Sequence, residues 1–486
     1  MRPLRDVGPL RLALVGTLAV TLVRLALLPL YQTALGPDEA QYWFWGQTLD
    51  WGYYSKPPVI AWVIALPTAL FGDHAWSARL LSPVLIGAAG LFLFGAARRL
   101  YDDRAALWTL VLWHLTPAVM LGATIVSTDV PLLLCWSAAL YALVRMTEGA
   151  SRYALLLGAA LGFGLLSKYA MIYWLVGLAL AAALSPRARR AGTLPIFGAV
   201  ALGVLVFAPN ILWNIANGMQ TVGHTADNAD WRGGLQWSEL TQFLGDQLGV
   251  AGPVVFLALL GALFAAFRRR RDPDVLLASF VLPPLLVISA QALLSRANAN
   301  WAMTAYPAAL ILVPAMLLRW RAAWALWSSA ALHGLVGLVF TAALLNFGVA
   351  DALGLSNAVK RLRGWDETAA QVLEAFAASN ADAVLLDDRE LAAHLVWELR
   401  DDSLPIMVLD PDGRPDNTYE LSMPFRPCTY ARALLVTPLT ELTAAHDAAG
   451  TRTRLPDLFV DLHAERRGRR ERTLEVYLVE APCPAD

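Results

Sequence analysis

Residues 36–58 read GPDEAQYWFWGQTLDWGYYSKPP, and they decide how the rest of the chain is interpreted. This stretch directly follows a hydrophobic segment. It carries the adjacent carboxylates Asp38 and Glu39, several Trp and Tyr residues, and then Lys56 before two prolines. Charged side chains are costly to keep at a membrane. The stretch therefore favours an enzyme that acts on a lipid-borne substrate over a passive membrane span.

The composition indicates a protein with many membrane spans and some soluble mass. The chain has 486 residues, of which 57% are hydrophobic and 16% are charged, and this is too apolar for a soluble protein of that length. The net charge of −1 says nothing about partners, because the charges are segregated along the chain. The first apolar run, residues 10–30, contains Arg24 and has no convincing small-residue cleavage site, so we expect a retained first helix.

A helix needs about 20 apolar residues to cross a bilayer. Arginine clusters fall at every second connection between the apolar runs, which predicts that these connections are cytoplasmic. The loops that start at Gly36, Ser127, Asn214 and Ser295 then face outward, and an odd number of spans places the C-terminus outside. The candidate spans are residues 11–31, 77–98, 105–125, 130–146, 153–168, 170–185, 193–213, 249–267, 274–294, 302–318 and 322–346.

Two further segments and a change in composition complete the predicted organisation. Residues 38–49 and 57–71 are predicted to be interfacial helices. From about Asp351 charges become frequent, which predicts a transmembrane domain over residues 1–350 and a soluble α/β domain over 351–486. In the latter we expect strands at 383–386, 406–409, 433–436 and 474–479, and helices at 388–400 and 439–449.

The three cysteines, Cys135, Cys428 and Cys483, show no metal-ligand spacing. An oxidising compartment would permit a disulfide between Cys428 and Cys483. Two unpaired thiols are an equally good interpretation of the sequence.

Polar residues in different predicted outer loops fall at one membrane level, which suits a shared cavity. None has a neighbour in sequence that would neutralise it. They are Asp38, Glu39, Lys56, Asp129, Lys168, His224, Arg296, Asn298 and Asn300, with Tyr42 and Tyr54 in the first loop.

Four motifs carry a resemblance to a known family: GPDEAQYW, YSKPP, STDVP and GLLSKY. Together they resemble the GT-C glycosyltransferases of the protein O-mannosyltransferase superfamily, and most of all the bacterial branch of lipid A aminoarabinose and rhizobial galacturonosyl transferases. The resemblance covers roughly the first 350 residues. It implies a GT-C fold, and with the candidate spans above we expect an α-helical polytopic membrane protein with about 11 transmembrane helices. The chain departs from the pattern at Val130, which separates Asp129 from Pro131, and at Ser55, where the aminoarabinose transferases carry an acidic residue.

The resemblance also implies a reaction, namely inverting transfer of a sugar from a polyprenyl-phosphate donor on the outer side of the inner membrane. Such a transfer needs a base for the acceptor hydroxyl. Asp38 is our candidate, with Glu39 and Asp129 beside it. The leaving phosphate needs cations, and for this role we expect Lys56, with Lys168 and Arg296 behind it. The expected substrate-binding residues are Tyr42, Tyr54, His224, Asn298 and Asn300. A carboxylate pair could also hold a divalent metal ion, although no motif demands a cofactor.

Each candidate also has a structural interpretation. Asp38 and Glu39 could favour the first turn of a helix, and Asp129 could be an N-cap. Lys56 and Lys168 could snorkel to lipid headgroups, and His224 could be an exposed loop residue. The aromatic residues Trp43, Trp45, Trp51, Tyr53 and Tyr54 are most simply an interfacial belt.

The expected partners are the lipid-phosphate donor, a lipid or glycan acceptor such as lipid A or lipopolysaccharide core, and membrane lipids, without nucleic acid. The expected location is the bacterial inner membrane, with the N-terminus cytoplasmic and the C-terminal domain periplasmic. Protein O-glycosylation is an alternative activity. A transporter or flippase of lipid-linked sugars is the alternative from another class, against which the sequence shows no inverted repeat.

Overall fold

The computed structural model describes residues 7–227, 233–410, 414–426, 429–438, 442–462 and 471–480. It divides into two compact units. The membrane unit comprises Met1–Pro29 and Asp50–Val339, and the sheet unit comprises Leu30–Leu49 and Phe340–Asp486. The predicted domain boundary at residue 350 stays a prediction, but the grouping of Leu30–Leu49 with the C-terminal residues was not anticipated.

The membrane unit consists of helices because its long apolar runs must satisfy their backbone hydrogen bonds internally. Among the described residues, seven helices are long and apolar enough to cross a membrane, or eight if the pair α14 (Trp237–Ala251) and α15 (Pro253–Arg269), bent by 111°, counts as one span. Every predicted span coincides with a helix or a helix pair, which confirms a polytopic membrane protein, whereas the count of eleven stays a prediction. The helices that match the predicted spans are α1 (Val7–Leu27), α5 (Leu81–Leu100), α6 (Asp103–Leu115), α7 (Pro117–Gly122), α8 (Asp129–Thr147), α9 (Ala154–Ser167), α10 (Ile172–Leu184), α12 (Thr193–Ala216), α15 (Pro253–Arg269), α16 (Asp272–Leu294), α17 (Tyr306–Arg319) and α18 (Ala323–Leu345).

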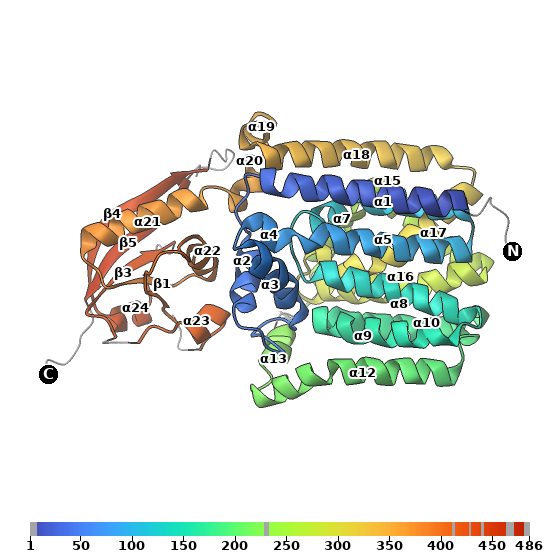
Figure 1. Ribbon diagram of the computed structural model, residues 1–486, viewed down its shortest axis with the longest axis horizontal. Coiled ribbons are helices and arrows are strands. Elements are labelled where there is room, and N and C mark those ends of the chain that lie inside the picture. Colours follow the sequence, from blue (N-terminus) through green and yellow to red (C-terminus); the bar gives the residue numbers. More distant parts are fainter. Residues whose placement is uncertain are drawn as a thin grey trace. The chain divides into compact units, whose positions relative to one another are not determined.

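Further helices, several of them labelled in Figure 1, lie between these elements along the chain. They are α3 (Val59–Phe71), which matches the second predicted interfacial helix, α4 (Ala75–Arg79), α11 (Pro186–Arg189), α13 (Gln220–Asp227) and α14 (Trp237–Ala251), together with the 3-10 turn η5 (Ala299–Ala305).

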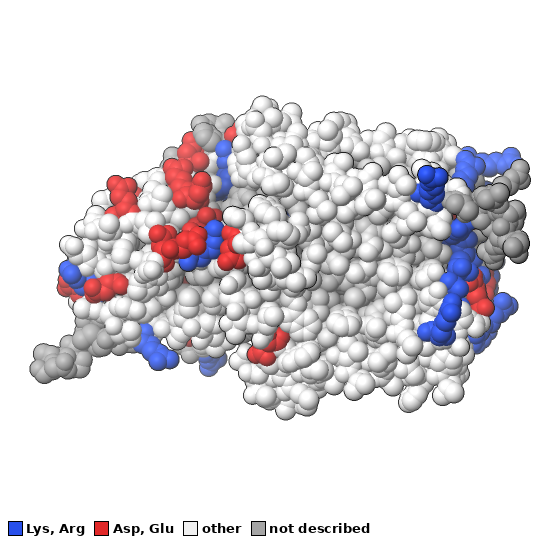
Figure 2. Space-filling model, in the orientation of Figure 1, with Lys and Arg blue, Asp and Glu red and all other residues white. Residues whose placement is uncertain are grey.

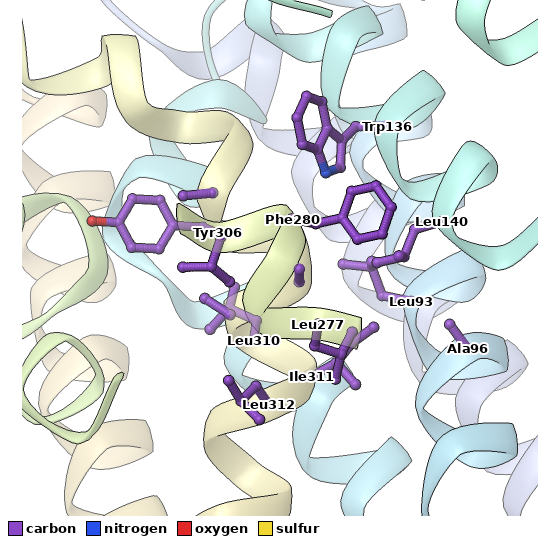
Figure 3. Packing of buried hydrophobic residues seen from close by; sticks show 14 of the residues in the cluster. Leu93, Ala96, Trp136, Leu140, Leu277, Phe280, Tyr306, Leu310, Ile311 and Leu312 are labelled. Atoms are coloured by element: carbon purple, nitrogen blue, oxygen red, sulfur yellow. The ribbon is translucent and has the colours of Figure 1, made fainter. Parts of the chain in front are cut away.

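The core of the membrane unit lies where α5, α8, α16 and α17 meet (Figure 3). Trp136 of α8, Phe280 of α16 and Tyr306 of α17 are fully buried there. The peripheral helices are apolar on their outer surfaces instead: Leu194 of α12 is 80% exposed and Trp324 of α18 is 68% exposed. Large exposed apolar areas of this kind mark contact with a membrane or another protein.

Charges gather at one end of the membrane unit, whose flank is almost free of them (Figure 2). At this end Glu148 lies 2.7 Å from Arg99, 3.4 Å from Arg145 and 3.6 Å from Arg187. Asp274 accepts hydrogen bonds from Arg319 at 2.6 Å and from the Tyr101 hydroxyl at 2.7 Å. These contacts tie together the ends of α5, α8, α11, α16 and α17.

The sheet unit contains one five-stranded sheet in the order β2-β1-β3-β5-β4. Strands β2 and β3 flank β1 in parallel, with Leu386 opposite Val408 and Val436, and β5 is antiparallel to both β3 and β4. The elements are β1 (Ala383–Leu386), β2 (Ile406–Val408), β3 (Arg432–Thr437), β4 (Thr451–Asp461), β5 (Glu471–Glu480), α2 (Pro37–Gly46), α19 (Phe347–Ala352), α20 (Ser356–Val359), α21 (Trp365–Ser379), α22 (Arg389–Glu398), α23 (Thr418–Ser422) and α24 (Ala444–Ala449).

The predicted strands match β1, β2, β3 and β5 within a few residues, and the helix predicted at 388–400 matches α22. The sequence analysis missed α21 and the edge strand β4, TRTRLPDLFVD, whose charges and proline hide its alternation. The helix predicted at 439–449 is observed from Ala444, while residues 439–441 lie outside the described part. Cys428 and Cys483 also lie outside it, so their disulfide stays a prediction.

Helix α2, which carries the acidic pair of the opening motif, packs inside the sheet unit. The Trp43 ring packs edge-on against the ring of Trp397 in α22, with their centroids 4.8 Å apart. The Trp45 indole donates a hydrogen bond to Thr418 Oγ1 at 2.9 Å. Trp43 is 5% exposed and Trp45 is 3% exposed. The interpretation of these two residues as an interfacial belt was therefore wrong, since they anchor α2 to α22 and α23.

Glu420 gives the sheet unit a testable pH dependence. Its buried carboxylate accepts a hydrogen bond from the Asp416 amide at 2.7 Å, and burial raises its pKa to about 7, against about 4.3 in an unfolded chain. Between these values the folded protein holds a proton that the unfolded chain has lost, so this carboxyl lowers stability as pH rises through the window. We expect Glu420→Gln to raise the melting temperature at pH 8 and not at pH 4, and the exposed control Glu480→Gln to change neither. Equal shifts at both pH values would contradict this.

Candidate active site

A cavity of about 360 Å³ lies in the membrane unit. Two of the predicted phosphate-binding residues, Lys56 and Lys168, line it. Lys56 precedes α3, and Lys168 caps the C-terminus of α9. The remaining lining is mostly apolar or aromatic, and consists of Ser55, Pro57, Tyr169, Ala170, Ile172, Tyr173, Thr225, Val287, Ile288, Gln291 and Trp301. This combination suits a ligand with an anionic head and an apolar body.

Asp129 fixes the geometry of Lys168. One carboxylate oxygen of Asp129 accepts from Lys168 Nζ at 2.8 Å, and the other accepts from Asn300 Nδ2 at 2.9 Å. Asp129 is the first residue of α8, and the N-cap position is Thr128, so the N-cap interpretation of Asp129 was wrong. Helix α8 runs from Asp129 to Thr147, past Arg145, so this cluster lies at the opposite end of α8 from the Glu148 ion pairs.

The loop that carries Lys56 is held by side chains that the sequence analysis did not single out. Asn210 of α12 donates to the Trp51 carbonyl at 2.7 Å, and Thr221 of α13 donates to the Tyr53 carbonyl at 2.6 Å. The Trp213 indole donates to Asp50 Oδ2 at 2.7 Å. Hydrogen bonds to backbone carbonyls fix the loop independently of the side chains that it presents.

Gly52 allows this loop to lie against α12. A Cβ atom built at Gly52 would come within 2.3 Å of the Trp213 ring, which is far inside van der Waals contact. We therefore expect Gly52→Ala to displace the loop, to destabilise the protein by about 1–3 kcal/mol and to weaken ligand binding at Lys56. Thermal unfolding and binding of a lipid phosphate measure both effects. The control is Gly223→Ala, since a Cβ there meets nothing within 4 Å. If both variants behave alike, the loop is not held in this way.

The other predicted residues of the membrane unit divide into two groups. Tyr54 and His224 lie beside each other, with ring centroids 5.4 Å apart, and Thr225 next to His224 lines the cavity. Arg296 and Asn298 are exposed and do not line it, although Asn300 contacts Asp129. The predicted shared cavity therefore brings together Lys56 and Lys168, with Asp129 and Asn300 behind them.

Asp38, Glu39 and Tyr42 belong to the sheet unit. The Asp38 carboxylate forms an ion pair through Oδ1 with Arg389 of α22, and the Arg389 Nε donates to Gln41 Oε1 at 2.8 Å. The Asp38 side chain remains 64% exposed, and Oδ2 accepts no hydrogen bond from the residues that the structure describes. Arg389 therefore orients this carboxylate and leaves one oxygen accessible.

Glu39 and Tyr42 are buried instead. Glu39 Oε2 accepts from the Gly36 amide at 2.8 Å and so caps the first turn of α2. Tyr42 is 4% exposed, and its ring lies 5.4 Å from that of Trp45. The capping interpretation thus has direct support at Glu39, whereas Asp38 points to Arg389.

The two remaining observations concern metal ligands and a second cavity. Within the described ranges, no group of three or more His, Cys, Asp or Glu side chains could hold a metal ion. A second, mostly apolar cavity of about 330 Å³ shares Tyr169 and Ile172 with the first. Its other lining residues are Leu165, Phe207, Asn210, Ile211, Asn214, Met219 and Val222.

Comparison with known proteins finds a matching family model and several similar proteins. Residues 55–213 match the family model described as dolichyl-phosphate-mannose-protein mannosyltransferase. A lipid A galacturonosyltransferase of Rhizobium johnstonii is 35% identical over 98% of this chain and 99% of its own length. An undecaprenyl phosphate-alpha-4-amino-4-deoxy-L-arabinose arabinosyl transferase of Pseudomonas fluorescens is 26% identical, over 54% of this chain and 52% of its own.

The fold itself has been observed in solved structures. The structure of ArnT from Cupriavidus metallidurans in the apo state matches 98% of both chains with a TM-score of 0.66 and 17% identity. The same enzyme bound to undecaprenyl phosphate matches 96% of this chain and 97% of its own, with a TM-score of 0.65 and 18% identity.

Proposed function

The chain belongs to the GT-C glycosyltransferases of the protein O-mannosyltransferase superfamily, in the branch of bacterial lipid A transferases, and from this premise we propose its reaction. It transfers a sugar from a polyprenyl-phosphate donor to a lipid or glycan acceptor of the lipid A or lipopolysaccharide-core kind. The proposal rests on one observation: Lys56 and Lys168 line the same cavity, and the rest of its wall is mostly apolar.

The two lysines have distinct parts in holding the donor. Lys56 contacts the phosphate as the principal cation, since an ammonium is a compact charge that suits a phosphate oxygen. Lys168 adds a second cation, whose position Asp129 and Asn300 fix. The adjoining apolar cavity takes the first isoprene units of the carrier, because burial of that surface is favourable.

In the proposed chemistry the acceptor hydroxyl oxygen attacks the anomeric carbon from the face opposite the phosphate. The bond between this carbon and the phosphate oxygen breaks, and the polyprenyl phosphate leaves with the bonding electrons while the lysines stabilise its charge. Asp38 takes the hydroxyl proton on Oδ2, and Arg389 orients the carboxylate. Attack from the opposite face inverts the anomeric configuration.

We also assign the membrane orientation on electrostatic grounds. The arginine-rich end of the membrane unit is cytoplasmic, because cytoplasmic connections carry excess Arg and Lys. The end with Lys56 and Lys168 then faces the periplasm, and the sheet unit is periplasmic. A reporter that is active only in the cytoplasm should be silent when it is fused after Asp486, and strong activity would overturn this orientation.

Mass spectrometry of envelope lipids tests the proposed function. Cells with the protein should contain a lipid A or core species that carries one additional sugar, and cells that lack it should not. A sugar found on envelope proteins, with unchanged lipids, would instead support the protein O-glycosyltransferase alternative, which the family model over residues 55–213 keeps open.

A further inference from the structure

A polar cavity of about 380 Å³ lies within the sheet unit, and the proposed transfer reaction does not use it. Its charged lining residues are the cations Lys360, Arg361 and Arg472 and the acids Asp388 and Glu390. The other lining residues are Trp365, Leu391, Pro438, Leu462, Thr473 and Leu474.

The topology of the sheet places this cavity where open α/β sheets bind ligands. Strand β1 ends at Leu386, two residues before Asp388, and β3 ends at Thr437, next to Pro438. From β1 the chain passes to β2 on one side and then returns to β3 on the other side, with all three strands parallel. The carboxyl ends of β1 and β3 therefore form a topological switch point, the usual position of a ligand crevice.

Arg472 places a positive charge in the cavity wall, and all its hydrogen-bond partners are neutral groups. Its guanidinium donates to Thr368 Oγ1 at 2.7 Å and to the carbonyl oxygens of Gly364 at 2.9 Å and Arg363 at 3.2 Å. No described residue forms an ion pair with it. Burial lowers the pKa of Arg472 to about 10, because the cost of desolvation outweighs the opposing effect of the nearby carboxylates Glu390 and Glu367.

The surroundings hold Arg472 in place rather than neutralise it. Its guanidinium carbon lies 3.4 Å from the centroid of the Trp365 ring. That ring stacks on the His394 ring, with the two ring centroids 3.6 Å apart. Lys360 and Arg361 are exposed, and neither side chain forms an ion pair within the described part of the chain. A fixed cation with two exposed cations beside it can bind an anion through charge-assisted hydrogen bonds.

We propose that this cavity is an accessory binding site for an anionic saccharide, that is, a sugar residue that carries a carboxylate or a phosphate group. Arg472, Lys360 and Arg361 bind the anionic group. Glu390 and the second oxygen of Asp388, whose first oxygen caps α22 by accepting from the Leu391 amide at 2.8 Å, accept hydrogen bonds from sugar hydroxyls. The site goes beyond the proposed transfer reaction, because none of its residues takes part in that reaction.

Calorimetric titration of the full chain in lipid nanodiscs tests the site, with galacturonate and galactose as probes that differ only in the carboxylate. We expect galacturonate to bind and galactose to bind at least about tenfold more weakly. The double variant Lys360→Ala/Arg361→Ala should lose at least about tenfold in galacturonate affinity. The control Arg454→Ala, an exposed arginine of β4, should bind like the unaltered protein.

One further variant separates this site from the donor site, and a kinetic measurement on the double variant identifies the source of the sugar. Lys56→Ala should leave galacturonate affinity unchanged, and loss of binding there, or equal binding of galactose, would overturn the proposal. A rise in KM for the lipid acceptor in the double variant would identify the saccharide as lipid-borne, and an unchanged KM with weakened galacturonate binding would identify it as soluble. Unchanged galacturonate affinity in the double variant would refute the site, whether or not the transfer reaction is established.

Discussion

Lys56→Ala is expected to weaken binding of polyprenyl phosphate by about 10- to 100-fold, since a hydrogen bond to a charged group contributes about 1.5–3 kcal/mol. Turnover should fall as well, because the phosphate gains charge as the sugar departs. Lys56→Arg should recover part of the binding, although a planar guanidinium presents its donors differently. Binding of polyprenyl phosphate without a sugar measures the effect separately from chemistry.

The control for this variant is Arg454→Ala, because it removes an exposed cation of the sheet unit to which no binding role is assigned. It should leave the affinity for polyprenyl phosphate unchanged. If Lys56→Ala binds the lipid as tightly as this control, then Lys56 is a snorkelling lysine and the phosphate lies elsewhere. Lys168→Met would be the next variant to test.

Asp38→Asn is expected to have the largest effect on rate. Asparagine keeps the size and polarity of the side chain but cannot take a proton, so we expect kcat to fall by about 100- to 10,000-fold. Donor affinity should change little, because the base acts on the acceptor. The measurement is a transfer assay with a polyprenyl-phosphate sugar, together with the lipid-binding assay above.

Asp402→Asn is the control for this change. Asp402 is exposed in a turn of the sheet unit, and no ion pair involves its side chain in the described ranges. It should keep normal turnover and normal melting temperature. Near-normal turnover of Asp38→Asn would show that Asp38 is not the base and that its contact with Arg389 has a structural purpose only.

The sequence was sufficient for the features that depend on local pattern. Long apolar runs predicted the membrane helices, and alternation predicted β1, β2, β3 and β5. The motifs also pointed to Lys56 and Lys168, which line one cavity, and to Asp129, which contacts Lys168. Each of these residues stands in a short motif next to an apolar run, where a charge is conspicuous because it is costly.

The features that were missed depend on contacts between distant parts of the chain. Arg389 follows Asp38 by 351 residues, and nothing near it in sequence distinguishes it from other helix-terminal arginines. Asn210, Trp213 and Thr221 are single polar or amphipathic residues among many, and only the folded loop shows what they bind. Likewise, the burial of Trp43 and Trp45 follows from the packing of α2 on α22, whereas composition alone suggested a membrane interface.

The central claim is that this protein transfers a sugar from a polyprenyl-phosphate carrier to a lipid A-like acceptor. Its most direct test is transfer by the purified protein in nanodiscs, supplied with polyprenyl-phosphate sugar donors and lipid A, with mass spectrometry of the lipid product. Our account predicts lipid A that carries one more sugar residue, with loss of this product in Asp38→Asn and Lys56→Ala. Unmodified lipid A in the presence of intact donor and stably folded protein would contradict the assignment of this donor and acceptor. Equal product from the two variants and the unaltered protein would contradict the proposed site.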